Sequence, residues 1–120
     1  MSSRKRFKSI LKYSDSRFKE IMKYDKNIYV KWIESNFDSN MTWDNYGKYW
    51  HIDHIKPCSS YNLENEDEYL ECFNWRNLRP CEIKENLYKS NKIDNNIINN
   101  YKQKALQFYT NYSANIESNN

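Results

Sequence analysis

Several features that would define a protein class are missing from this 120-residue sequence. The three cysteines, Cys58, Cys72 and Cys81, stand singly with no CxxC pair, which argues against a structural zinc site of the two-knuckle kind. No apolar run approaches the roughly 20 residues needed to cross a bilayer. The odd number of cysteines and the missing signal peptide favour reduced thiols. We therefore expect a soluble intracellular protein with no membrane contact and no structural zinc.

The sequence contains no internal repeat and no linker that would divide it, so we expect one domain over residues 1–120. Its 4 Trp, 11 Tyr and 5 Phe predict an aromatic-rich core. The one glycine, Gly47, follows Trp43-Asp44-Asn45-Tyr46. A positive φ at Gly47 would reverse the chain before residue 48.

Basic residues are concentrated in two parts of a chain whose net charge is only +3. Residues 1–31 hold ten Lys or Arg against three acids, and residues 76–92 hold five against two. Residues 62–75, between them, hold five acids and no base. This distribution suits a polyanion whose phosphates must be neutralised, but solvated lysines on helix faces would give the same count.

Hydrophobic periodicity predicts an α+β chain in three parts. A helical part, residues 1–47, would hold helices over 4–11, 16–24 and 26–37, the last with one apolar stripe. The central part, residues 48–92, would contain a strand over 48–55, a helical turn over 68–73, a second strand over 77–81 that pairs with the first, and a helix over 82–91. The helical turn would bury Tyr69, Leu70 and Phe73. Residues 93–120 would form a long helix with a tail that frays from about Asn115.

The central part also contains the residues that could carry chemistry. Hydrolysis of a phosphodiester needs an activated water and a cation that neutralises charge on the phosphate. Mg²⁺ or Mn²⁺ takes oxygen ligands, so the Asp53 carboxylate and the Asn86 amide oxygen form a plausible minimal pair. The His54 imidazole can accept a proton near neutral pH. These three side chains predict a hydrolytic site.

The order of these residues resembles the HNH endonucleases, in the variant whose third signature residue is Asn. The matching residues are Trp50-x-Ile52-Asp53-His54-Ile55-x-Pro57, then Asn77-Leu78, then Asn86 followed by Lys89. The segment before them, Phe37 through Met41-x-Trp43-x-Asn45-Tyr46-Gly47, looks like the lead-in of HNH proteins from phages and large viruses. The resemblance covers most of residues 28–92.

The resemblance implies a ββα-metal, or His-Me finger, core in which two strands and a helix hold one divalent ion. By matching position, Asp53 and Asn86 would be metal ligands, His54 the general base, and Asn77 a residue that braces the loop. The family's reaction cuts DNA to leave 5′-phosphate and 3′-hydroxyl ends, as an endonuclease or a nickase. Basic residues flanking the site are candidates for contact with double-stranded DNA: Arg76, Arg79, Lys84, Lys89 and Lys92.

Three other interpretations stay open. The chain could keep the fold and bind DNA without cutting it. It could instead be a structural zinc module that uses Cys58, Cys72, Cys81 and a histidine. A Cys58–His54 nucleophile is disfavoured because Pro57 intervenes and nothing visible would activate the thiolate. His51, two residues before Asp53, is expected to be structural.

Overall fold

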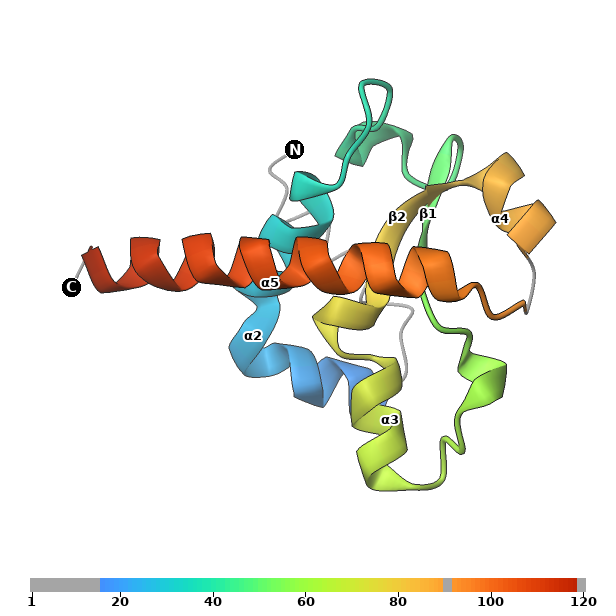
Figure 1. Ribbon diagram of the computed structural model, residues 1–120, viewed down its shortest axis with the longest axis horizontal. Coiled ribbons are helices and arrows are strands. Elements are labelled where there is room, and N and C mark those ends of the chain that lie inside the picture. The colour runs from blue at the N-terminus through green and yellow to red at the C-terminus, as the bar shows by residue number, and fades with distance from the viewer. Residues whose placement is uncertain (1–15, 90–91, 119–120) are drawn as a thin grey trace.

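The computed structural model describes residues 16–89 and 92–118, which form a mixed α+β structure (Figure 1). The helix predicted over residues 4–11 lies outside this part. The described helices and strands are, in chain order, α2 (Ser16–Ser35), β1 (Trp50–His54), α3 (Glu66–Cys72), β2 (Leu78–Glu82), α4 (Ile83–Lys89) and α5 (Asn95–Ser118). Three short 3-10 helices lie between them: η1 (Trp43–Asn45), η2 (Cys58–Ser60) and η3 (Trp75–Asn77).

Strands β1 and β2 pair as the sequence predicts, and the structure shows that the pair is antiparallel, with Asp53 opposite Arg79 and His54 opposite Leu78. Gly47 has a φ of +84°, and its amide donates to the Trp50 carbonyl at 2.8 Å, so the chain reverses just before β1 as expected. Helix α4 begins directly after β2 (Figure 1) and contacts both strands. The result is a strand, long connection, strand and helix, in that order.

The core is aromatic, as the composition predicts. Helix α2 buries Ile28, Tyr29, Trp32 and Ile33. The Trp32 ring lies edge-on to Trp75, Tyr101 and Phe108, which come from η3 and α5. Its indole Nε1 donates to the Leu78 carbonyl at 2.7 Å, which ties α2 to the first residue of β2. The Trp32 side chain therefore holds the strand pair against the helices and also provides a hydrogen-bond donor for the buried Leu78 carbonyl.

Part of the acidic segment before β2 stabilises the first turn of α3. The Asn65 side chain accepts from the Glu68 amide at 3.0 Å and caps the helix, and Glu66, Asp67 and Glu68 occupy the first turn. Acidic side chains at that end interact favourably with the helix dipole.

Three sequence predictions about the helices are wrong. The helices predicted over 16–24 and 26–37 are one helix, α2, because residues 16–35 contain neither glycine nor proline to interrupt it. Helix α5 continues to Ser118 instead of fraying from Asn115. In α3 the buried side chains are Tyr69 and Cys72, while Leu70 is 42% exposed. Cys72 follows Tyr69 by three residues and shares its face, whereas Leu70 is turned away from it.

The described part of the chain contains no helix with both the length and the apolar character that crossing a membrane requires.

Candidate active site at the end of strand β1

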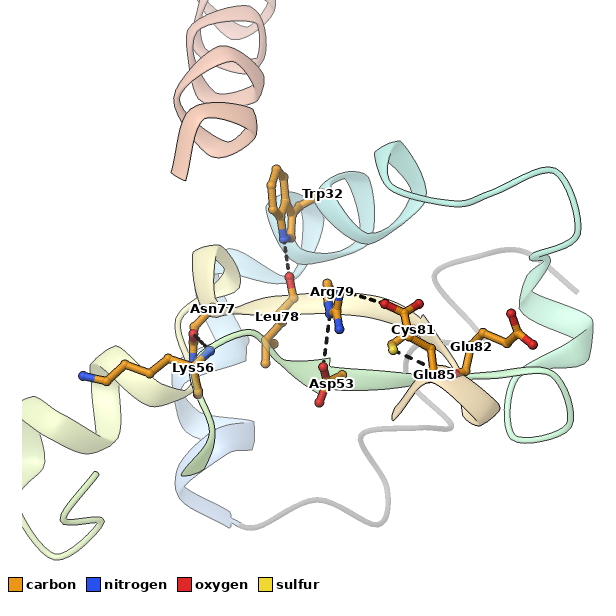
Figure 2. A network of polar contacts seen from close by, with 9 residues as sticks. All are labelled: Trp32, Asp53, Lys56, Asn77, Leu78, Arg79, Cys81, Glu82 and Glu85. Atoms are coloured by element: carbon orange, nitrogen blue, oxygen red, sulfur yellow. Dashed lines mark hydrogen bonds and ion pairs between the residues drawn. The ribbon is translucent and has the colours of Figure 1, made fainter. Parts of the chain in front are cut away.

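Asn77 holds the chain where it leaves β1. Its Oδ1 accepts from the Lys56 amide at 2.8 Å, and its Nδ2 donates to the carbonyls of Lys56 at 3.1 Å and Cys72 at 2.9 Å. Its own carbonyl accepts from the Ile55 amide at 2.7 Å. One amide side chain thus joins the residues after His54 to the end of α3, and the pair with Lys56 is visible in Figure 2. The backbone next to His54 is fixed by these bonds.

Asp53 belongs to a buried charge network (Figure 2). Its Oδ2 accepts from Arg79 Nε at 3.1 Å, and the two residues are only 8% and 5% exposed. They face each other in the strand register, so their side chains lie on one face of the pair. Arg79 Nη1 also lies 3.6 Å from Oε1 of Glu85 in α4. Burial lowers the pKa of Arg79, but Cys81 and Asp53 raise it more, so the guanidinium stays charged.

Asn86 follows Glu85 in α4 and is half-buried. Because α4 packs on both strands and Glu85 pairs with Arg79, the helix that carries Asn86 is joined to the face that carries Asp53. The Asp53 carboxylate already has a cationic partner, however. Any divalent ion at Asp53 would share that carboxylate with Arg79.

His54 is the last residue of β1 and directly follows Asp53. Its ring packs edge-on against Phe73 at a centroid distance of 5.0 Å. A ring nitrogen of His54 and the Sγ atoms of Cys58 and Cys72 all lie within 4.8 Å of one another. We call these three residues the His54–Cys58–Cys72 cluster.

The two sulfur atoms of this cluster are 3.1 Å apart. Burial raises the pKa of the Cys72 thiol, and the hydrogen bond with Cys58 raises it further, so Cys72 is a thiol rather than a thiolate. Tyr61 lies beside the cluster, with its amide bonded to the Cys58 carbonyl, and burial together with Glu71 raises its pKa to about 12. The surroundings of the cluster therefore favour neutral groups.

An open groove of about 640 Å³ adjoins the loop after His54. It runs between this loop, the end of α3, η3 and the first turns of α5. Three cations line it, Lys56, Arg76 and Lys102, against one acid, Glu71. Asn77 also lines the groove. A basic groove of this kind suits a polyanionic strand.

The basic residues expected to contact DNA have different environments. Arg79 is buried against Asp53, so its assignment to the DNA-contacting surface is wrong. Arg76, Lys84 and Lys92 are exposed, and Arg76 lies over the Trp75 ring at 4.2 Å. The Lys89 side chain lies outside the described part. Sequence reasoning missed two groove residues: Lys56, which adjoins the motif and could have been found there, and Lys102, which no sequence signal connects to it.

Cys81 and His51 lie apart from the His54–Cys58–Cys72 cluster. They face each other in the strand pair, three residues before His54 on β1, and Cys81 is buried. The His51 ring packs against Tyr46 at a centroid distance of 6.3 Å, in line with a structural role. A zinc module using all three cysteines therefore lacks support, because only two of them meet.

Two viral proteins are similar to this chain. Uncharacterized protein L426 of Acanthamoeba polyphaga mimivirus is 50% identical over 84 residues, which are 70% of this chain and 37% of that protein. Uncharacterized protein L246 of the same virus is 35% identical over 96 residues, 80% of this chain and 42% of that protein. The chain thus spans less than half the length of either relative. No protein-family profile and no solved structure matches it.

Proposed function

We propose that this chain is a metal-dependent DNA endonuclease or nickase of the HNH type, in the variant with a third-position Asn. It would hydrolyse phosphodiester bonds to 5′-phosphate and 3′-hydroxyl ends on a ββα-metal core made of β1, β2 and α4. The supporting observation is the order of the signature residues on these elements. Asp53 and His54 end β1, Asn77 directly precedes β2, and Asn86 lies in the helix that follows.

The donor set fits a hard cation. The Asp53 carboxylate and the Asn86 amide oxygen are ligands that Mg²⁺ and Mn²⁺ accept, with water and substrate phosphate completing the shell. When bound, the ion would neutralise charge that develops on the phosphate. Arg79 fixes the direction of the Asp53 carboxylate, since its Nε donates to Oδ2.

His54 is the residue proposed to move a proton. Its imidazole would take a proton from the attacking water, because it is the side chain of the site whose ordinary pKa lies near neutral pH. The Phe73 ring restricts its orientation, and the Asn77 hydrogen bonds fix the backbone that follows it. Asn77 would thus act on the site through the loop it braces.

DNA, in double-stranded form, is the proposed substrate. The groove beside Asn77 offers Lys56, Arg76 and Lys102 for phosphate contacts. Lys84, two residues before Asn86 in α4, is also exposed and is a further candidate for a phosphate contact.

Plasmid nicking with Mg²⁺, against the same reaction with EDTA, tests the proposal. We expect the wild-type protein to nick only with the metal, and His54→Ala to lose about 10²- to 10⁴-fold in rate, the usual contribution of a general base. His51→Ala is the matched control, because it removes the chain's other histidine. Both variants should keep near-normal DNA affinity in a gel-shift assay. Equal nicking by His54→Ala and wild type would remove His54 from the mechanism.

A second candidate function is DNA binding without cleavage on the same fold. The Arg79–Asp53 pair favours it, because a guanidinium already neutralises the carboxylate that an ion would need. Binding in the gel-shift assay with no nicking in either Mg²⁺ or Mn²⁺ would select this alternative.

A further inference from the structure

Of the three residues in the His54–Cys58–Cys72 cluster, only His54 takes part in the proposed cleavage. It joins three segments: the end of β1, the 3-10 helix η2 and the last residue of α3. Asn77 bonds the backbone of Lys56, which lies between β1 and η2, and the backbone of Cys72 at the end of α3. The three side chains thus meet on a braced part of the chain.

We propose that His54, Cys58 and Cys72 form a binding site for one Zn²⁺ ion. Thiolate and imidazole are the ligands that zinc prefers, whereas Mg²⁺ takes oxygen, and zinc would displace the thiol proton of Cys72 to solvent as it binds. Zinc bonds of about 2.3 Å to sulfur and 2.0 Å to nitrogen put tetrahedral ligand atoms roughly 3.5 to 3.8 Å apart. The ligand atoms here lie within 4.8 Å, and the two sulfurs at 3.1 Å. Side-chain movements of about 1 Å or less would meet these distances.

The three ligands leave a fourth position for water or another exogenous donor. Sites with three protein ligands and one open position are typical of exchangeable or catalytic zinc rather than of closed structural zinc. His54 and Cys58 are only half-buried, so an ion would have an entry path from that side. The site is also separate in chemistry from Asp53 and Asn86, which offer oxygen alone.

Zinc at this cluster would engage the imidazole that the proposed nuclease uses as its base. A ring nitrogen that donates its electron pair to a metal cannot accept a proton from water. Zinc would therefore inhibit cleavage, and a thiol-to-serine change would relieve that inhibition. This consequence rests on the proposed function, but the metal site itself does not.

Cobalt titration tests the site directly. Co²⁺ added to the reduced 120-residue chain should give a thiolate-to-cobalt charge-transfer band that saturates at one equivalent and disappears when Zn²⁺ is added. Cys58→Ser should lose most of the band. Cys81→Ser and His51→Ala are matched controls that should keep it, because neither residue is in the cluster. His54→Ala should weaken binding by more than the roughly 10- to 100-fold that loss of an outer-shell contact costs.

A wild-type protein without the band, or a band unchanged in Cys58→Ser, would overturn the proposal. Cys72→Ser provides a second variant, with circular dichroism as the check that this buried site still folds. In the nicking assay, Zn²⁺ should inhibit the wild type and Cys81→Ser but spare Cys58→Ser, while equal inhibition of all three would contradict the shared imidazole. The cobalt band tests metal binding at the cluster whether or not the protein cuts DNA. A failure of the zinc proposal can therefore be distinguished from a failure of the nuclease proposal.

Discussion

Asp53 and His54 are neighbours in β1, yet they belong to different chemical environments. Asp53 pairs with Arg79, which reaches Glu85 in α4, and this side of the strand pair is held by buried charge. His54 meets the Phe73 ring and two cysteine sulfurs, where neutral groups are favoured. One side offers hard oxygen donors and the other soft nitrogen and sulfur donors. The two proposed metal sites, at adjacent residues of one strand, would therefore prefer different metals.

The two sides also differ in what holds them together. A buried ion pair is sensitive to loss of one partner, because the remaining charge is left without compensation in a medium of low polarity. The His54 side depends on neutral hydrogen bonds from Asn77 and on ring packing, whose individual contributions are smaller. The Asp53 side should therefore be the more fragile of the two.

Asp53→Ala is expected to lower the free energy of unfolding more than any other variant that tests this comparison. Removing the carboxylate leaves the buried Arg79 with the exposed Glu85 as its acidic partner, so the free energy of unfolding should fall by roughly 3 to 5 kcal/mol. His54→Ala should cost clearly less. Urea unfolding of both variants measures the difference. A double variant, Asp53→Ala with Arg79→Met, should recover part of the loss, and equal stability of the two single variants would contradict the comparison.

Asn77→Ala should have an intermediate effect on the free energy of unfolding. It removes one acceptor and two donor interactions that join Lys56 to Cys72, and a loss of about 1 to 3 kcal/mol in the free energy of unfolding is expected. Asn77→Asp is the matched control, since it keeps the acceptor for the Lys56 amide and loses both donors. Faster hydrogen exchange at the Lys56 amide in Asn77→Ala, but less so in Asn77→Asp, would locate the effect in the loop. Unchanged exchange would mean that Asn77 does not brace it.

The smallest effects are expected from replacing single lysines, and they concern DNA binding. They would show whether DNA contacts the groove or α4. If the groove holds a DNA strand, Lys102→Ala should reduce the salt dependence of binding by about one unit of slope, as one lost phosphate contact does. If DNA lies against α4, Lys84→Ala should do so instead. Lys31→Ala, an exposed position on α2, is the control. Binding measured at several salt concentrations separates these outcomes.

Local sequence patterns predict the elements around the site well. Apolar alternation ended by Pro57 marks β1, the single glycine marks the turn before it, and helical spacing marks the buried stripe of α2. These predictions depend on neighbours within one or two turns, which is the range over which periodicity carries information. The motif order also ranks Asp53, His54, Asn77 and Asn86 as the residues to test. The prediction divided α2 into two helices on a weak periodic signal, although residues 16–35 contain no glycine or proline that would interrupt a helix.

The sequence by itself determined the aromatic core, the two strands with a helix after them, and the candidate residues in their order. Only the tertiary structure decided that Arg79 faces Asp53 instead of solvent, that Lys102 lines the groove, and that Cys58 and Cys72 meet at His54 while Cys81 does not. Arg79 and Asp53 are 26 residues apart in the chain, and the two cysteines are 14 apart. Contacts at such separations depend on strand register and helix packing, which no local pattern encodes.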